Sequence, residues 1–256
     1  LFDKEKVHII TGRGCPYSCS YCCHSFYNRL YNEQASKIRK RSVENVIEEI
    51  TQFKKRFPLK FVVFDDDIFI LPREWLKEFS REYKKYVNLP FFCYLRVDLV
   101  DASTLQDLKS AGCFSVSMGV ETADDYLRNS IFKRHMSKEQ IIDAARLIKE
   151  YKIRLKTSNI IGIPGSSIDV DLDTIKLNIE CKADYSSVEI LTPYPKTEIC
   201  SLISKNKDTG PLAFDLRDKY SKWGCDSYQI FAEDLLVEIN ELSGDSLLRG
   251  KEKEQK

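Results

Sequence analysis

The stretch VHIITGRGCPYSCSYCCHS, residues 7–25, begins as a strand and ends in a cluster of cysteines. Its opening residues are mostly β-branched, which favours an extended strand. Four cysteines and one histidine then follow within residues 15–24. Elsewhere in the chain the cysteines are scattered singly. The loop after the first predicted strand is therefore where metal or redox chemistry is expected.

Three kinds of structure could explain this concentration of thiols: a disulfide, a zinc site or an iron–sulfur cluster. The chain has nine cysteines, an odd number, and no secretory signal, which argues against a disulfide framework. A zinc site takes four protein ligands, and His24 could join the cysteines, but it lies very close to Cys22 in a tight loop. The C-x3-C-x2-C spacing of Cys15, Cys19 and Cys22 suits a cubane cluster better, with one iron left without a protein ligand.

The composition is that of an ordinary globular protein, with 256 residues, 43% hydrophobic and 31% charged, and a formal net charge of +1. This charge gives no electrostatic reason to expect nucleic acid or an anionic membrane as partner. No apolar run approaches the roughly 18 residues of a membrane span, and the first residues do not form a signal peptide. We therefore expect a cytoplasmic protein. Because the chain lacks an initiator Met, we expect a longer protein with an upstream domain.

Strand-like and helix-like segments alternate along most of the chain, which predicts an α/β fold with a parallel sheet and right-handed crossovers. Six such units are too few for a closed eight-stranded barrel, so we expect an open, partial TIM-like (βα)6 barrel. Residues 1–200 would form this core domain and 201–256 a C-terminal helical extension with a charged tail. The expected strands lie at 7–11, 60–65, 91–96, 114–121, 155–163 and 186–192, and the expected helices at 42–57, 73–87, 102–112, 137–151, 168–182, 215–222 and 231–242.

With Tyr21 as the aromatic residue, Cys-x3-Cys-x-aromatic-Cys resembles the signature of the radical S-adenosylmethionine (SAM) superfamily. The resemblance extends over roughly residues 5–200. It implies that Cys15, Cys19 and Cys22 bind a [4Fe–4S] cluster whose open iron chelates SAM, with Tyr21 beside the cofactor. Reductive cleavage of SAM would then yield a 5′-deoxyadenosyl radical that abstracts hydrogen from a substrate. The electron would come from a low-potential flavodoxin or ferredoxin.

The segment LTPYPKTEI, residues 191–199, resembles the Pro-x-Pro-Gly-Thr stretch of the subgroup that often carries a cobalamin-binding domain. Lys196 stands where that subgroup usually has Gly. The resemblance implies methyl transfer or skeletal rearrangement, with cobalamin held by a domain upstream of this chain. Two alternatives stay open at this point: a non-catalytic iron–sulfur redox sensor and a zinc-stabilised interaction domain.

Polar residues at predicted strand ends are candidates for cofactor contacts. In the family, residues after the second strand hold the methionine amine of SAM, so Asp66 and Asp67 are candidates here. A helix cap or a solvated loop would also explain these adjacent aspartates. Glu121 matches the family position that contacts the ribose hydroxyls or the methionine carboxylate region of SAM, and we expect it to be a ribose ligand.

The fifth predicted strand ends in NIIGIPGSS, residues 159–167, where the family presents backbone and apolar side chains to adenine. Ile161 and Ile163 are the matching side chains. At the end of the third predicted strand, Arg96 could pair with a carboxylate of the cofactor or substrate. It could equally form a salt bridge with Asp98 or with one of the aspartates at 65–67.

The sequence also predicts where two further sets of side chains lie. Arg128 and Arg134 flank the helix expected after the fourth strand and are predicted to lie on a solvated face, with a contact to the cofactor as the alternative. Tyr94, Ser117 and Thr157 are predicted to line the interior of the barrel, since alternate strand residues point to one side.

Overall fold

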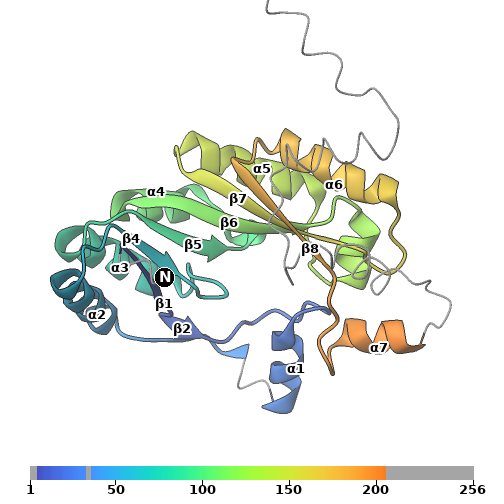
Figure 1. Cartoon of the computed structure of the whole chain (residues 1–256), viewed down its shortest axis with the longest axis horizontal. Helices are drawn as coiled ribbons and strands as arrows, with labels where there is room; N and C mark the ends of the chain where they lie inside the picture. Colours follow the sequence, from blue (N-terminus) through green and yellow to red (C-terminus); the bar gives the residue numbers. More distant parts are fainter. Residues whose placement is uncertain (1–4, 33–35, 206–256) are drawn as a thin grey trace, which may run out of the picture.

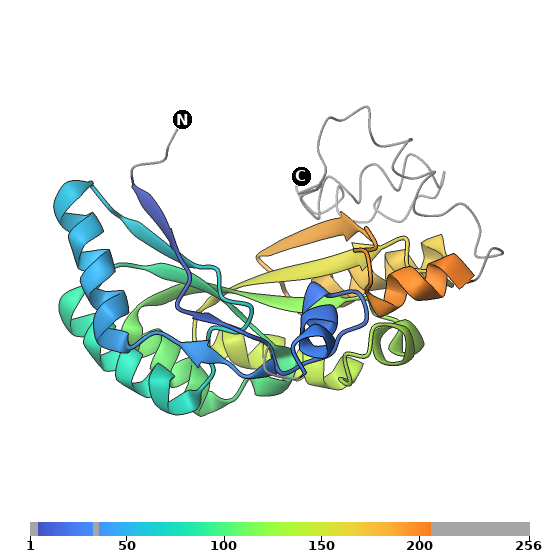
Figure 2. The same cartoon turned by 90° about the horizontal axis from the view of Figure 1, so that it is seen from below.

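The expected strands form one parallel sheet in the computed structural model, which describes residues 5–32 and 36–205. Each strand pairs with the next one of the sheet in parallel orientation. Figure 2 shows the sheet curved into an open trough, with helices along its convex side. The open TIM-like barrel is thus confirmed. In order across the sheet the strands are β1 (Lys6–Ile9), β4 (Phe61–Phe64), β5 (Phe91–Leu95), β6 (Cys113–Glu121), β7 (Arg154–Ile161) and β8 (Tyr185–Ile190).

The helices that cover the convex side lie close to their predicted bounds (Figure 1). Ser42 caps the first of them by accepting a hydrogen bond from the backbone N–H of Asn45. Ser137 and Gln140 form the expected capping box. Gly112 ends a helix in the left-handed region, with φ of 100°. These helices are α2 (Val43–Arg56), α3 (Arg73–Tyr86), α4 (Ala102–Ala111), α5 (Lys138–Glu150) and α6 (Ile168–Glu180).

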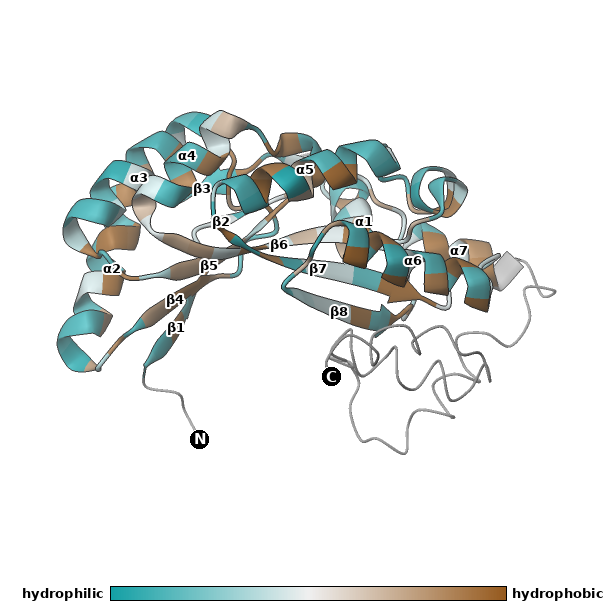
Figure 3. Cartoon of the chain, turned by 90° about the horizontal axis from the view of Figure 1, so that it is seen from above, coloured by the Kyte–Doolittle hydropathy of each residue, from teal (hydrophilic) through white to brown (hydrophobic). Residues whose placement is uncertain are grey.

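The core between the helices and β4 and β5 is strongly aromatic. The rings of Phe64 and Phe69 stack with centroids 4.6 Å apart, and Phe79, Tyr83 and Phe91 surround them, all fully buried. Figure 3 shows hydrophobic residues on the strands and on the helix sides that face them. Loss of one such ring costs about 3–5 kcal/mol of stability, so this packing holds the strand ends in place.

Side chains of the sheet alternate between the helix-covered face and the concave face. Ser117 lies on the concave face, with its Oγ 3.3 Å from the Oγ of Ser158 on the next strand. The prediction that Thr157 lines the interior is wrong. Thr157 pairs in register with the fully buried Met118, and its Oγ1 lies 2.8 Å from the Oγ of Ser186 within the helix-covered layer. Because the side-chain period is two, the interior position belongs to the next residue along β7.

Two features near the cysteines were not expected. The helix α1 (Cys23–Leu30) begins directly after the third cysteine of the motif. The short strand β2 (Gly12–Arg13) directly precedes the cysteine loop and pairs in antiparallel orientation with β3 (Arg39–Lys40). The cysteine loop is therefore framed by a strand pair on one side and a helix on the other.

A further helix, α7 (Glu198–Lys205), crosses the boundary expected at residue 200. The helices predicted at 215–222 and 231–242, and the charged tail, lie outside the described residues. Among the helices that are described, none has the length and apolar character needed to span a membrane.

Candidate active site at the cysteine loop

The cysteine loop, residues 14–22, connects β2 to α1 and is held by backbone hydrogen bonds from both sides. The Ser20 N–H donates to the Phe132 carbonyl at 3.1 Å, and the Ser20 carbonyl accepts from the Ile199 N–H at 3.1 Å. Asn28 of α1 donates from Nδ2 to the carbonyl of Cys15 at 3.1 Å. The loop is thereby fixed between the segment after β6 and the start of α7, which lies beside α1 (Figures 1 and 2).

The three candidate ligand thiols are largely shielded from water and are near enough to influence one another electrostatically. Cys19 is buried, and Cys15 and Cys22 are half-buried. Burial raises the pKa of the Cys15 thiol to about 11 and that of the Cys22 thiol to about 12, and the neighbouring thiols contribute to both shifts. Without metal, the thiols of Cys15 and Cys22 are therefore protonated at neutral pH, and binding of iron to these two must release their protons.

A cubane iron–sulfur cluster fits this donor set. Within the described residues, no three Cys, His, Asp or Glu side chains converge as the ligands of a single metal ion would. A [4Fe–4S] cluster does not need such convergence, because each thiolate binds a different iron at its own corner. The buried guanidinium of Arg96 points Nη1 at the Sγ of Cys19 from 3.6 Å, which suits a sulfur that becomes negatively charged on ligation.

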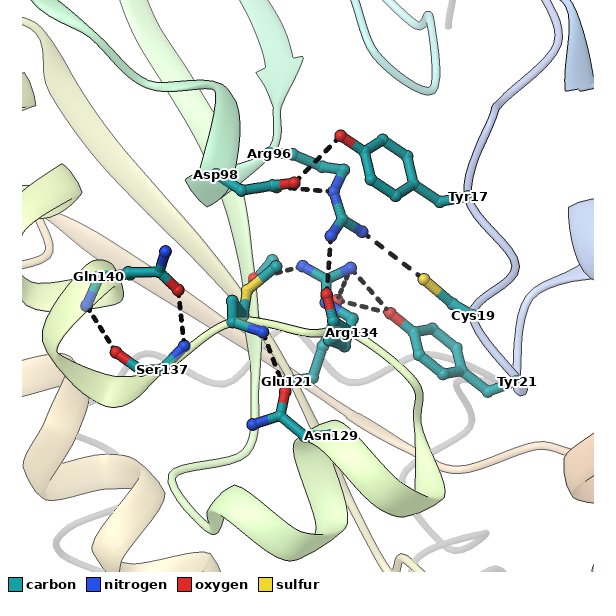
Figure 4. A network of polar contacts seen from close by, with 12 residues as sticks. Tyr17, Cys19, Tyr21, Arg96, Asp98, Glu121, Asn129, Arg134, Ser137 and Gln140 are labelled. Atoms are coloured by element: carbon teal, nitrogen blue, oxygen red, sulfur yellow. Dashed lines mark hydrogen bonds and ion pairs between the residues drawn. The ribbon is translucent and has the colours of Figure 1, made fainter.

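A buried carboxylate at the end of β6 is tied to the same loop (Figure 4). The hydroxyl of Tyr21 donates to Oε1 of Glu121 at 2.9 Å. Nη1 of Arg134 lies 3.3 Å from the same oxygen and 3.1 Å from the Tyr21 hydroxyl. Burial raises the pKa of Glu121, and the charge of Arg134 and the hydrogen bond from Tyr21 oppose that rise. The structure thus brings Tyr21 and Glu121, both predicted site residues, into direct contact.

Gly119 makes room for this arrangement. A Cβ at this position would lie 2.8 Å from Nη2 of Arg134 and would collide with Oε1 of Glu121. Glu121 itself has a φ of 65°, in the left-handed region that residues other than glycine rarely adopt. The backbone at the end of β6 is therefore shaped around the side chains of Glu121 and Arg134.

The prediction that Arg128 and Arg134 lie on a solvated face is wrong. Arg128 is fully buried and Arg134 is 7% exposed. Arg128 donates from Nη1 to the Thr122 carbonyl at 2.8 Å and from Nε to the Met136 carbonyl at 3.0 Å. The chain after β6 folds back on itself and leaves carbonyl groups in its interior, and these arginines satisfy them.

Asp66 forms an internal ion pair and lies in the buried part of the site. Its Oδ2 accepts from the N–H of Thr11 at 3.0 Å, and its Oδ1 accepts from the Thr11 hydroxyl at 2.8 Å and from Nζ of Lys40 at 2.9 Å. The side chains of Asp66 and Lys40 are 3% and 5% exposed. Its protein partners already satisfy both carboxylate oxygens. Sequence reasoning did not find Thr11 or Lys40, because neither belongs to a recognisable motif.

Asp67 points to a different environment. Its Oδ2 lies 2.8 Å from Nε2 of His24, and its side chain is 46% exposed. Asp67 and His24 line a pocket of about 540 Å³ beside the cysteine loop, together with Ile10, Gly12 and Gly14. Unlike its neighbour Asp66, Asp67 is accessible to a ligand in this pocket.

The two predicted adenine contacts differ in exposure. Ile161 is half-buried at the end of β7. Ile163 is fully buried in a small cluster with Leu127, Phe132 and Ile199, against which Tyr21 packs. Ile163 therefore lies under the cysteine loop and supports Tyr21.

The sequence profile of the radical SAM superfamily matches residues 9–177. The chain therefore belongs to the radical SAM superfamily. It is 29% identical over 204 residues to an uncharacterized methyltransferase of Pyrococcus horikoshii, with 77% of this chain and 43% of that protein covered. It is 26% identical over 249 residues to a putative methylthiotransferase of Methanocaldococcus jannaschii, with 91% and 52% covered. The chain thus spans about half the length of the curated relatives it matches.

Solved structures show the same fold. The radical SAM methyltransferase TsrM from Kitasatospora setae superposes with a TM-score of 0.68 at 19% identity, covering 79% of this chain and 39% of that chain. The cobalamin-dependent radical enzyme OxsB gives a TM-score of 0.55 at 19% identity, covering 79% and 30%. Radical SAM proteins use a [4Fe–4S] cluster and SAM, and this chain is a member of that enzyme class.

Proposed function

We propose that residues 1–200 are the SAM-cleaving core of a larger radical enzyme, with residues 201–256 as an extension. The observation that carries this proposal is the contact between the cysteine loop and the strand ends. Tyr21 of the Cys-x3-Cys-x-aromatic-Cys motif donates directly to Glu121 at the end of β6. A cluster bound by the loop and a cofactor that reaches the strand ends would therefore both be positioned by the Tyr21–Glu121 contact.

In this proposal Cys15, Cys19 and Cys22 would ligate a [4Fe–4S] cluster and would leave one iron without a protein ligand, available to SAM. Bound together, cluster and SAM supply a 5′-deoxyadenosyl radical that abstracts hydrogen from the substrate. Asp67 is the proposed partner of the methionine ammonium group. It is exposed to the pocket and close enough to Cys15 to raise the pKa of that thiol. Asp66 is left out of this role because its oxygens are already engaged.

Glu121 is the proposed partner of the ribose hydroxyls. Its recorded protein contacts fall on Oε1, from Tyr21 and Arg134, so Oε2 is the oxygen that would face the ligand. The backbone around Ile161 is the proposed adenine contact, with Ile163 beneath it excluding water from the loop. These side chains would orient SAM so that its sulfonium faces the cluster.

We further propose methyl transfer or a related carbon-centred reaction, with cobalamin held by a part of the protein outside this chain. Support comes from the relatives, which include a methyltransferase and a putative methylthiotransferase, and from TsrM, which was solved with cobalamin and a [4Fe–4S] cluster. A low-potential flavodoxin or ferredoxin is the proposed electron donor. A cytoplasmic location is proposed because reduced thiols and a low-potential cluster need a reducing compartment.

Anaerobic reconstitution of the protein with iron and sulfide tests the core proposal. We expect a brown protein that converts SAM to 5′-deoxyadenosine when a strong reductant is added, measured by liquid chromatography with mass spectrometry. A colourless protein that binds zinc would contradict the cluster, and a brown protein that leaves SAM intact would indicate a redox sensor.

Substitution of single cysteines tests the ligand assignment. Cys19→Ala should abolish cluster assembly while the circular dichroism spectrum stays that of a folded α/β protein. Cys23→Ala is the matched control, since Cys23 is adjacent to Cys22 but falls outside the motif spacing. It should retain iron, sulfide and SAM cleavage. Full iron content in Cys19→Ala, or loss of the cluster in Cys23→Ala, would show that the ligands are assigned wrongly.

A further inference from the structure

Arg96 lies directly after β5 and directs one nitrogen at the cysteine loop (Figure 4). Nη1 lies 3.6 Å from the Sγ of Cys19, Nε lies 2.8 Å from Oδ1 of Asp98, and Nη2 lies 2.9 Å from the carbonyl oxygen of Arg134. The residue is 6% exposed. Each guanidinium nitrogen thus has its own partner, and the partner of Nη1 is a sulfur.

Two neighbours hold this guanidinium in place. Its Cζ lies 3.6 Å from the ring centroid of Tyr17, a stacking contact that a planar guanidinium makes well. The Tyr17 hydroxyl donates to Oδ2 of Asp98 at 3.0 Å, so the ring and the carboxylate are also joined. Tyr17 belongs to the cysteine loop itself. The position of Arg96 and the shape of the loop are therefore fixed by the same contacts.

The pairing with Asp98 does not account for the whole of this arrangement. Asp98 accepts a hydrogen bond from Nε of Arg96, whereas Nη1 is directed to the sulfur of Cys19. A surface salt bridge would need neither a buried guanidinium nor a sulfur contact. Hydrogen bonds to the sulfurs of an iron–sulfur cluster are among the features that set its reduction potential. Reduction adds one electron to the cluster, and a cationic donor stabilises the reduced form more than the oxidised one.

We propose that Arg96 tunes the reduction potential of the cluster by donating an N–H to the thiolate of Cys19. This inference rests on the proposed assignment of Cys19 as a cluster ligand. Arg96 makes the cluster easier to reduce and so widens the range of donors that can start SAM cleavage. Its role is exerted through a ligand sulfur and requires no contact with SAM or substrate.

The test is a potentiometric titration of the reconstituted protein without SAM, followed by electron paramagnetic resonance of the reduced cluster. In Arg96→Met the equilibrium constant for reduction should fall about tenfold, as expected for loss of one charge-assisted hydrogen bond. For a one-electron couple this is a shift of about 59 mV to more negative potential. Arg96→Lys, which keeps the charge, should recover part of the shift.

Arg128→Met is the matched control. Arg128 is also a buried arginine, but its recorded contacts are with Asp125 and with carbonyl groups such as those of Thr122 and Met136, and none is with a cysteine. The cluster in Arg128→Met should have the same midpoint potential as the cluster in the wild type. Equal shifts in Arg96→Met and Arg128→Met would overturn the proposal, because a general loss of buried charge would then explain both.

An unchanged midpoint in Arg96→Met with full iron and sulfide content would also overturn it. If Arg96→Met fails to assemble a cluster, Arg96→Gln takes its place, since its amide can still donate to the Arg134 carbonyl. An unshifted midpoint in that variant would be equally decisive. Absence of a cluster from the wild type would instead refute the proposed function, so the two failures are distinguishable.

Discussion

Asp66 and Glu121 are two buried carboxylates, one just after β4 and one at the end of β6, and their surroundings differ. Asp66 accepts hydrogen bonds on both oxygens from Thr11 and Lys40. The recorded contacts of Glu121 involve Oε1 alone, from Tyr21 and Arg134. Both residues look alike in sequence, as acidic residues after a hydrophobic strand. Counting the donors around each oxygen separates a carboxylate that holds the fold from one that can still bind a ligand.

The largest effect is expected from Asp66→Ala. It would leave the ammonium of Lys40 buried without a counter-charge, and breaking a buried pair in this way typically costs about 3–5 kcal/mol of unfolding free energy. Urea unfolding followed by circular dichroism measures this loss. Asp66→Ala combined with Lys40→Met should recover part of the stability, since no unpaired charge remains. If Asp66→Ala were as stable as the wild type, the claim that Asp66 stabilises the fold would be wrong.

Glu121→Gln should have a smaller and different effect. The amide keeps the shape and can still accept from Tyr21, but it removes the charge that would accept from the ribose hydroxyls. We expect SAM affinity to fall about tenfold with the cluster intact, as for loss of a hydrogen bond to a charged group. Anaerobic calorimetric titration of SAM measures it.

Asp66→Asn is the matched control for that measurement. It neutralises the other buried carboxylate, so among the molecules that fold it should bind SAM as the wild type does. A loss of affinity in Asp66→Asn with none in Glu121→Gln would reverse the assignment of the two residues.

The smallest effect is expected from an exposed carboxylate, Asp101, which caps α4 by accepting from the N–H of Thr104. Its slight burial raises its pKa, but the hydrogen bonds from Thr104 outweigh this and hold the pKa below the usual value of 3.8. A depressed folded-state pKa gives stability that is present above the unfolded-state pKa and is lost as the pH falls through the folded-state pKa. Asp101→Asn should cost only a few tenths of a kcal/mol at neutral pH, because Asn caps equally well.

Urea unfolding of Asp101→Asn and the wild type at a series of pH values checks this. The difference in unfolding free energy between the two proteins should become smaller as the pH is lowered into the acid range. A difference that grew on acidification would mean that Asp101 is not stabilised as a carboxylate.

The sequence predicted the strands of the six-stranded sheet, the helices on its convex side and the cysteine motif, because each depends on local patterns. Alternating β-branched runs, capping residues such as Ser137, and cysteine spacing all act within a few positions of the chain. The contact of Tyr21 with Glu121 was accessible only through the family resemblance, which placed both residues at the cofactor.

The failures share a different cause, since they concern contacts between residues far apart in sequence. The partner of Asp66 is Lys40, on a short strand that no pattern indicated. Arg134 is buried because the chain after β6 turns back toward the cysteine loop, which charge alone does not reveal. Thr157 was misplaced because a single residue of strand register decides which face a side chain takes.

The backbone bond from Ile199 to Ser20 has a practical consequence for any shortened form of the protein. The superfamily match ends at residue 177, yet the cysteine loop is hydrogen-bonded to Ile199, which lies beyond it. Nη2 of Arg29, in α1, also donates to the carbonyl of Lys196 at 2.9 Å. A fragment that ends with the matched region would keep every cysteine of the motif but would lose these two hydrogen bonds, which hold the cysteine loop and α1. The shortest piece worth expressing for spectroscopy therefore runs through α7.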